Sequence, residues 1–329
     1  MGPTSPHPIR DVRIANAATY WPIAPTDVVL AVPIAARLLL GATPAGRVLQ
    51  AAAFGAYAAS ALQDWAARRG VRKIDFRQEF GADVGHLTPM PREVREEEVR
   101  LLTQRLNDEF TSRTIPRREL AVEVDRHLTS YIAGITGQRV KTSTEVRSFS
   151  VARLLFPFAL GACDFVSGDV TVFRDVGVFE PHVIAHEFSH RKGYWKELEA
   201  QALAYLALTA SGEPALVQSA LCERLHRDWR ALSGDDRAAF RDHLEHSDLR
   251  PELQAQFLDL NRGAALGGGA GPVEVLMRRL YDERMRLTGQ NGLSDYDVGF
   301  TNFLYTFELS STARQEAPPA GAVRARSSI

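Results

Sequence analysis

The distribution of apolar residues along the chain predicts a protein built mainly from helices. The broad apolar stripe of residues 91–112 predicts one helix, and a second is expected at 117–135, ended by Gly134 or Gly137. Residues 200–209 are apolar on nearly all sides, which predicts a buried central helix. Further segments bounded by Pro, Ser, Asp or Gly predict helices at 214–232, 235–246, 251–260, 272–287 and 294–309.

Residues 140–175 have a different pattern and predict the β structure of the chain. This stretch is rich in Val, Phe, Ser and Thr, and is interrupted by Pro157, Gly161 and the Ser167-Gly168 pair. Such runs favour two to four short strands joined by turns. The expected fold class is therefore mainly α with a small β-sheet, an α+β arrangement.

The N-terminal region contains two apolar runs, Thr26–Gly41 and Arg47–Trp65, separated by a Thr-Pro turn. Together they predict a hydrophobic helical hairpin over residues 24–70. Basic residues on both sides of the pair favour a membrane anchor with both ends in the cytoplasm. However, a membrane span needs about 20 predominantly apolar residues, and charged residues interrupt the first run. Membrane association through residues 24–66 and a soluble hairpin packed on the body are therefore both open alternatives.

Composition and charge narrow the classes of function. Hydrophobic residues make up 45% of the 329 positions and the formal net charge is −1, so no global basic field attracts nucleic acid. The two cysteines, Cys163 and Cys222, are too few for a disulfide framework and are expected as reduced thiols. Residues 1–23 are expected to be a flexible tail and residues 311–329 a disordered one. Because the start of the chain lacks the pattern of a signal peptide, we do not expect secretion.

The strongest chemical signal is an HExxH motif with His186 and His190 as its histidines and Glu187 between them. Histidines four residues apart lie one above the other on a helix face, which is the spacing two imidazoles need to hold one zinc ion. The glutamate is placed to take a proton from water at the metal. A proline at position 181 and a glycine at position 193 are typical of the start and the end of such a helix.

A hydrolytic zinc site needs three protein ligands and an open position, so a third ligand must come from outside the motif. The candidates are Glu197 and Glu199 on the next helix, of which only one can face the metal, because residues two apart diverge on a helix. We favour Glu197, because Gln201 one turn later continues a polar stripe and would hydrogen-bond to this ligand. Glu199 is then expected to pair with a nearby Lys or Arg, and the opposite assignment stays open.

The residues from position 186 to position 200 read HExxHxxGxxxExEA. This line resembles the zincin metallopeptidases, in particular the gluzincin branch, whose third ligand is a helical glutamate. It is most similar to an uncharacterised family of bacterial membrane-anchored proteins that pair N-terminal hydrophobic helices with such a domain. The resemblance implies a zincin-like metallopeptidase domain over residues 71–310, preceded by the hairpin. It also implies a bacterial-type protein that is cytoplasmic, or attached to the inner membrane with this domain on the cytoplasmic side.

The motif and the resemblance together predict a zinc-dependent metallopeptidase with a peptide or protein substrate. Zn²⁺ held by His186, His190 and Glu197 would activate water, and Glu187 would act as the general base. Three alternatives stay open: a non-catalytic zinc-binding, membrane-linked regulatory protein; a zinc hydrolase of non-peptide amides; and an all-helical protein with ordinary histidines.

Three further features near the motif receive candidate roles. The strand near Gly168–Phe173 is expected to pair with an extended substrate. Tyr296 is a candidate oxyanion stabiliser, with an ordinary core tyrosine as the alternative. His182 lies one helical turn before His186 and is either an extra ligand or an ordinary first-turn histidine.

Overall fold

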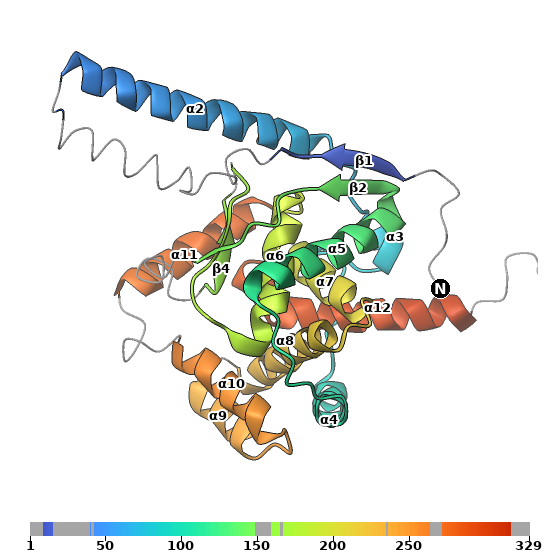
Figure 1. Cartoon of the computed structure of the whole chain (residues 1–329). Helices are drawn as coiled ribbons and strands as arrows, with labels where there is room; N and C mark the ends of the chain where they lie inside the picture. Colours follow the sequence, from blue (N-terminus) through green and yellow to red (C-terminus); the bar gives the residue numbers. More distant parts are fainter. Residues whose placement is uncertain are drawn as a thin grey trace, which may run out of the picture.

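The computed structural model describes residues 9–15, 40, 43–148, 159–164, 167–234, 236–263 and 272–316. Within these residues the protein is mainly helical with two small sheets, which confirms the predicted mainly-α class (Figure 1). The helices are α2 (Pro44–Arg69), α3 (Phe76–Phe80), α4 (Arg92–Asp108), α5 (Arg117–Thr136), α6 (Glu180–Arg191), α7 (Glu197–Thr209), α8 (Pro214–Ser233), α9 (Arg237–Glu245), α10 (Pro251–Gly263), α11 (Pro272–Leu287) and α12 (Val298–Glu316). Two short 3₁₀ helices are η3 (Gly177–Phe179) and η4 (Leu293–Tyr296).

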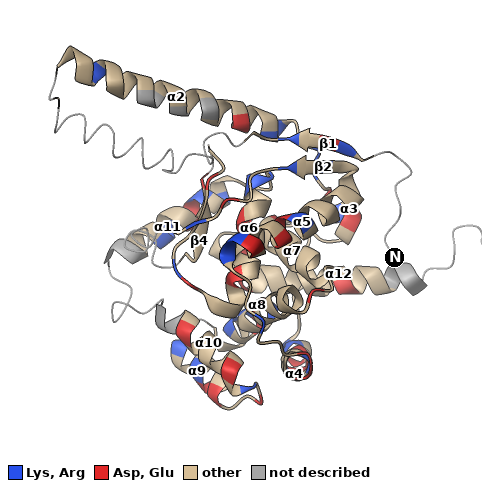
Figure 2. Ribbon diagram, viewed as in Figure 1, with Lys and Arg blue, Asp and Glu red and all other residues tan. Residues whose placement is uncertain are grey.

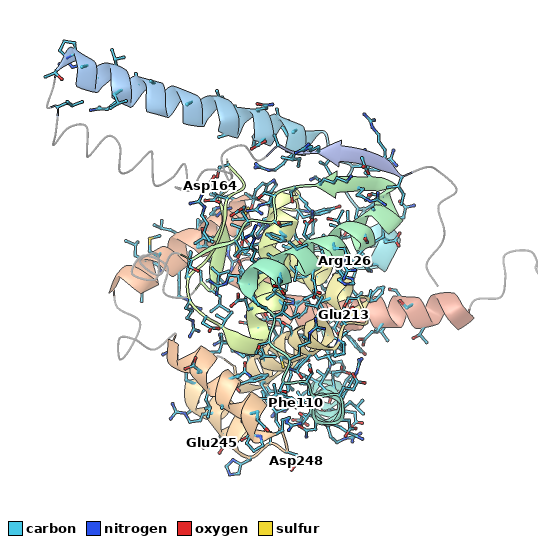
Figure 3. All side chains as sticks on the ribbon, in the orientation of Figure 1. Phe110, Arg126, Asp164, Glu213, Glu245 and Asp248 are labelled. Carbon is cyan, nitrogen blue, oxygen red and sulfur yellow. The ribbon has the colours of Figure 1, made fainter. Side chains whose placement is uncertain are left out.

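Helices α6 and α7 form the centre of the molecule. They pack against each other, and α5, α8 and α12 pack around them (Figure 1). Every residue of α6 is buried, as is almost every residue of α7, so neither helix keeps a solvent-facing side. Side chains fill the space between α5, α6, α7 and α8 (Figure 3). The prediction of a central buried helix at residues 200–209 is therefore confirmed.

A three-stranded sheet lies against α6. Its strands are β3 (Arg147–Ser148), β5 (Val170–Val172) and β4 (Gly161–Cys163), in the order β3-β5-β4. Strand β5 is parallel to β3 and antiparallel to β4, so it occupies the middle of the sheet. The expectation that the strand near Gly168–Phe173 pairs with a substrate is therefore wrong, because both of its edges already have partners. Among the described residues, β4 is the edge strand that also packs on α6.

A second sheet corrects the predicted N-terminal tail. Strand β1 (Arg10–Arg13) pairs in parallel with β2 (Gln138–Lys141). Its flanking Ile14 is buried with Val71 and Val140 in a small separate cluster. Residues 10–13 are thus part of the fold, because a short alternation of apolar and polar residues buries one face against β2 and the end of α2. The rest of the predicted tail, residues 1–8 and 16–23, lies outside the described residues.

Helix α2 covers the second apolar run and extends away from the body (Figure 1). Its start is set by Thr43, whose hydroxyl accepts a hydrogen bond from the Gly46 amide at 3.2 Å, and by a proline in the first turn. Its C-terminal half contacts the body through buried Ala61, Asp64 and Arg68, whereas side chains of its N-terminal half are mostly exposed. The first arm of the predicted hairpin, apart from residue 40, lies outside the described residues. No helix among the described residues is both long and apolar enough to cross a membrane.

The C-terminal boundary also differs from the prediction. Helix α12 continues to Glu316, so residues 311–316 of the expected disordered tail are helical, and residues 317–329 lie outside the description. The short helix α3 has no counterpart among the predicted helices. It is capped by Asp75 and ends at Gly81, whose φ of 71° is left-handed, and its two phenylalanines are buried.

Candidate metal centre

Helix α6 is shaped at both ends by local sequence. Pro181 occupies its first turn, where a missing amide proton costs nothing. At its C-terminus, the Gly193 amide donates to the His190 carbonyl at 2.8 Å and the Tyr194 amide donates to the Ser189 carbonyl at 3.0 Å. These two bonds form a Schellman motif, which requires the left-handed φ of 96° found at Gly193. The turn leads directly into α7, which begins at Glu197.

The turn between the two helices brings the side chains of His186, His190 and Glu197 together. The Nε2 atoms of the two histidines lie 3.1 Å apart, and each lies 3.1 Å from Glu197 Oε2. Each side chain thus offers one ligand atom to a common point, and all three residues are buried. The structure brings Glu197, and not Glu199, to the histidines.

The residues present fit a metal ion. Zinc binds nitrogen and carboxylate oxygen at about 2.0–2.2 Å, which separates neighbouring ligand atoms by roughly 3.0–3.5 Å. Burial opposes charge on His190, yet the adjacent Glu197 raises the pKa of His190 to about 9. Burial likewise opposes charge on Glu197, yet the two histidines hold the pKa of Glu197 well below its usual range. The three side chains therefore favour a positive charge between them, which a metal cation supplies as well as a proton does.

The orientation of His190 suits ligation. Its Nδ1 lies 2.7 Å from the Tyr194 carbonyl oxygen, so Nδ1–H donates to this acceptor. The neutral imidazole then has its free electron pair on Nε2, the atom that faces His186 and Glu197. The indole of Trp195 stacks on the ring at 5.8 Å between centroids. His186 has no comparable support, because its Nδ1 is buried without a hydrogen-bond partner among the described residues.

Glu197 is held by α11 and by the segment that joins α11 to η4. Its Oε1 accepts a hydrogen bond from the Tyr281 hydroxyl at 2.5 Å. Its amide donates to Gln290 Oε1 at 2.7 Å, which satisfies one of the free amides at the start of α7. Sequence reasoning missed both residues, because they come from a segment more than 80 positions later.

The prediction for Gln201 is wrong, whereas the one for Glu199 is confirmed. The Gln201 amide donates to Glu223 Oε1 on α8 at 2.7 Å and does not reach Glu197. The polar side chain at this position of α7 is therefore explained by Glu223, a buried carboxylate on the neighbouring helix. Glu199 pairs with Lys196, with Nζ and Oε1 3.3 Å apart, so it turns away from the histidines as expected.

Glu187 lies on the side of α6 that faces strand β4. A side chain at Gly161 would place its Cβ 3.1 Å from Glu187 Oε1 and 3.0 Å from the Thr171 carbonyl, so glycine leaves the space that the carboxylate occupies. Burial raises the pKa of Glu187 above its usual range, although both motif histidines oppose this shift. The carboxylate is thus next to the ligand triangle and next to an edge strand.

Two fully buried cations after the motif attach the β structure to α6. Arg191 donates to the carbonyl oxygens of Ser143, Glu145 and Gly168 at 2.7–2.9 Å. Lys192 donates to Asp125 at 2.6 Å and to the Val140 carbonyl at 3.0 Å. Buried charges need such complete pairing. These contacts fix the strands relative to the helix that carries the histidines.

Of the two further candidates, Tyr296 lies beside the ligand triangle and His182 lies outside it. The Tyr296 hydroxyl lies 3.3 Å from that of Tyr281, and its ring centroid is 6.0 Å from that of His186. His182 is not part of the ligand triangle. It is buried near Phe300 and Glu223, and burial lowers its pKa to about 4, so it matches the ordinary alternative.

Comparison with known proteins adds one similarity. Residues 174–305 match a protein family described as "Protein of unknown function (DUF3810)". The matched segment is less than half of the chain, and it contains the HExxH helix, Glu197, Tyr281 and Tyr296. Searches of curated proteins and of solved structures found no match.

Proposed function

We propose that the protein is a zinc-dependent metallopeptidase. The observation that carries this proposal is the buried triangle of His186 Nε2, His190 Nε2 and Glu197 Oε2, with each pair 3.1 Å apart. Three ligands of this kind are typical of catalytic zinc sites, whereas structural sites usually have four. The zincin-like character of the domain, which the motif suggested, belongs to the same proposal.

The role of each site residue follows from its position. His186, His190 and Glu197 would hold the ion, which supplies Lewis-acid polarisation and lowers the pKa of water at the site. Glu187, next to the triangle, takes the proton of the attacking water and delivers it to the leaving amine. Tyr296 is the candidate to donate a hydrogen bond to the developing oxyanion, because its ring lies beside His186.

Strand β4 supplies a reason to expect a peptide substrate. An extended peptide can add to a sheet edge through main-chain hydrogen bonds. In the part of the chain that the structure describes, β4 is the edge strand next to Glu187, since Gly161 at its start faces the carboxylate. A peptide bound there would have its backbone close to the general base.

One observation favours the non-catalytic, zinc-binding regulatory protein as a second candidate. His186, Glu187, His190 and Glu197 are between 4% and 7% exposed, and closed sites are typical of structural zinc. A structural site has no use for a general base, so Glu187 is the residue that separates the two functions.

The test measures zinc content and hydrolysis separately. We expect close to one zinc per chain in the purified protein, and His186→Ala should abolish this binding. Glu187→Gln should keep the zinc and lower cleavage of a peptide mixture, followed by mass spectrometry, by about 10²–10⁴-fold. Wild-type protein without zinc would refute the metal site, and an unchanged cleavage rate in Glu187→Gln would refute the catalytic role.

A further inference from the structure

The metal site is closed in this structure. His186, Glu187, His190 and Glu197 are between 4% and 7% exposed, so their side chains have almost no contact with solvent. A peptide substrate would need access to the ligand triangle and to Glu187. Helices α6 and α7 are buried on nearly all sides and cannot move without loss of the core. A covering element at the edge of the molecule therefore has to open.

Helix α11 covers the Glu197 side of this site. The Tyr281 hydroxyl lies 2.5 Å from Glu197 Oε1, whereas Oε2 is the carboxylate oxygen near the two histidines. Met285, one turn after Tyr281 on the same face of the helix, is 1% exposed. The inner face of α11 thus lies on one of the three candidate metal ligands.

The rest of α11 is attached weakly to the body. From residue 275 to residue 287, Met285 is the single buried side chain. Several exposed residues of the helix are charged, among them Arg279, Glu283 and Arg284 (Figure 2). The main packing partner of α11 is the short helix η4, and Figure 1 shows α11 outside the group of helices around α6 and α7. A helix with so few buried contacts can leave the body at a small cost while the core stays folded.

The connection from α11 to η4 has the features of a hinge. Gly289 and Gly292 have left-handed φ angles of 77° and 86°, so two of its positions tolerate a wide range of backbone angles. Between them, Gln290 Oε1 accepts a hydrogen bond from the Glu197 amide, and the Asn291 side chain donates to a backbone carbonyl at 3.1 Å. These two bonds keep the connection on the body. Rotation at the glycines therefore moves α11 and leaves η4 in place.

Two hydrogen bonds join the inner face of α11 to parts of the body that stay fixed. The first is the bond from Tyr281 to Glu197 on α7. In the second, Asp282 Oδ1 accepts from the Leu293 amide at the start of η4, at 2.7 Å. Both bonds break when α11 rotates away, so they form the latch of the closed state.

We propose that α11 is a lid over the metal site, which opens by rotation about residues 289–292 and is latched by the Tyr281–Glu197 and Asp282–Leu293 bonds. The purpose of the lid, access of a peptide, rests on the proposed function. Its opening is a property of the zinc-free protein as well, so the lid is tested without reference to catalysis.

The experiment measures hydrogen exchange by mass spectrometry and histidine modification by diethyl pyrocarbonate, both on zinc-free full-length protein. Tyr281→Phe removes one bond of the latch and should speed exchange of the amides in residues 275–287 by about 5–10-fold. Modification of His186 and His190 should accelerate by a similar factor, because the same opening exposes their rings. His182, which is 2% exposed and outside the ligand triangle, should stay unreactive.

Tyr305→Phe is the matched control, because it makes the same change on another helix, α12, and it should leave both rates as in the wild type. Circular dichroism checks that the variants are folded. The proposal is overturned if Tyr281→Phe leaves the exchange of α11 unchanged. It is also overturned if this exchange rises while the two histidines react no faster, because the helix would then fray without uncovering the site. Zinc content decides the metallopeptidase separately: a protein that opens as expected but binds no zinc supports the lid and refutes the proposed function.

Discussion

The α6–α7 pair and the two outlying helices α2 and α11 use side chains in opposite ways. In α6 and the residues just after it, charged and polar groups such as Glu187, Arg191 and Lys192 are buried. In α2 and α11, leucine and valine face solvent. The buried cations can enter the centre because they find partners there, such as the three carbonyls around Arg191. Burial in this protein therefore follows available partners as much as hydrophobicity.

The largest expected effect is on zinc binding at the α6–α7 pair. Structural zinc sites with four ligands bind with about 10–16 kcal/mol, which is roughly 2.5–4 kcal/mol per ligand. We expect Glu197→Ala to weaken zinc binding by more than about 100-fold, measured by chelator competition. Glu199→Ala is the matched control and should change the affinity by less than about threefold, because Glu199 pairs with Lys196. Equal effects of the two substitutions would contradict the assignment of Glu197.

The same truncation in the two regions should differ in its effect on stability. Leu203 on α7 is fully buried, so Leu203→Ala should lower the free energy of unfolding by about 2–5 kcal/mol. Leu62 on α2 is 58% exposed, and Leu62→Ala should stay within about 0.5 kcal/mol. Urea denaturation measures both values. A large loss from Leu62→Ala would mean that α2 is covered in solution.

Tyr281 links the two regions, because it belongs to α11 and contacts Glu197. Removal of its hydroxyl in Tyr281→Phe should weaken zinc binding by about 10–100-fold, the usual range for loss of a group that orients a ligand. Thermal stability without zinc should change little, since the ring stays in place. An unchanged zinc affinity would show that Gln290 and the helix start suffice to hold Glu197.

His226 on α8 is a buried polar residue without a hydrogen-bond partner in the described structure. Neither ring nitrogen has a hydrogen-bond partner among the described residues, and Phe179, Phe240 and Phe257 surround the ring. His226→Phe should therefore raise the free energy of unfolding at pH 7 by about 1–2 kcal/mol, measured in urea. His246→Phe, at an exposed position, is the control and should change little. A loss of stability in His226→Phe would show that the imidazole is needed.

The same substitution has a defined pH dependence. Burial lowers the pKa of folded His226 to about 4, and Arg227 adds to this shift, whereas Glu223 and Asp297 oppose it. In the unfolded chain the pKa is about 6.5, so the unfolded state takes up the proton first as the pH falls. Because of this difference, acidification from about pH 6.5 toward pH 4 lowers the free energy of unfolding, whereas above about pH 6.5 the titration of His226 has no effect on it. His226→Phe should remove this part of the acid sensitivity.

Sequence reasoning succeeded where local periodicity decides the geometry. The four-residue spacing of His186 and His190 fixes their shared helix face, and the same rule allows only one of Glu197 and Glu199 to face the histidines. The preference for Glu197 itself rested on Gln201, whose predicted contact the structure does not contain. It failed for Gln201, because the partner of a buried amide depends on which helix packs there. It also missed Tyr281, whose contact with Glu197 depends on a long connection that no local pattern describes.

The fold likewise could be predicted from the sequence only where a local pattern determines the structure. Helices with continuous apolar stripes were predicted close to their observed bounds, whereas β1 was missed. Four residues with one half-buried valine carry too weak a signal, and their pairing with β2 spans more than 120 positions. Likewise, the alternation at residues 170–172 predicted a strand but not that it lies between two others.

The bond that orients His190 comes from the peptide carbonyl of Tyr194, not from a side chain. Every amino acid has that carbonyl, so evolutionary change of the side chain at position 194 leaves the acceptor in place. Gly193 has no such freedom, because its φ of 96° disfavours other residues. The orientation of this histidine therefore depends on one glycine and on the path of the main chain, and not on the side chain at position 194.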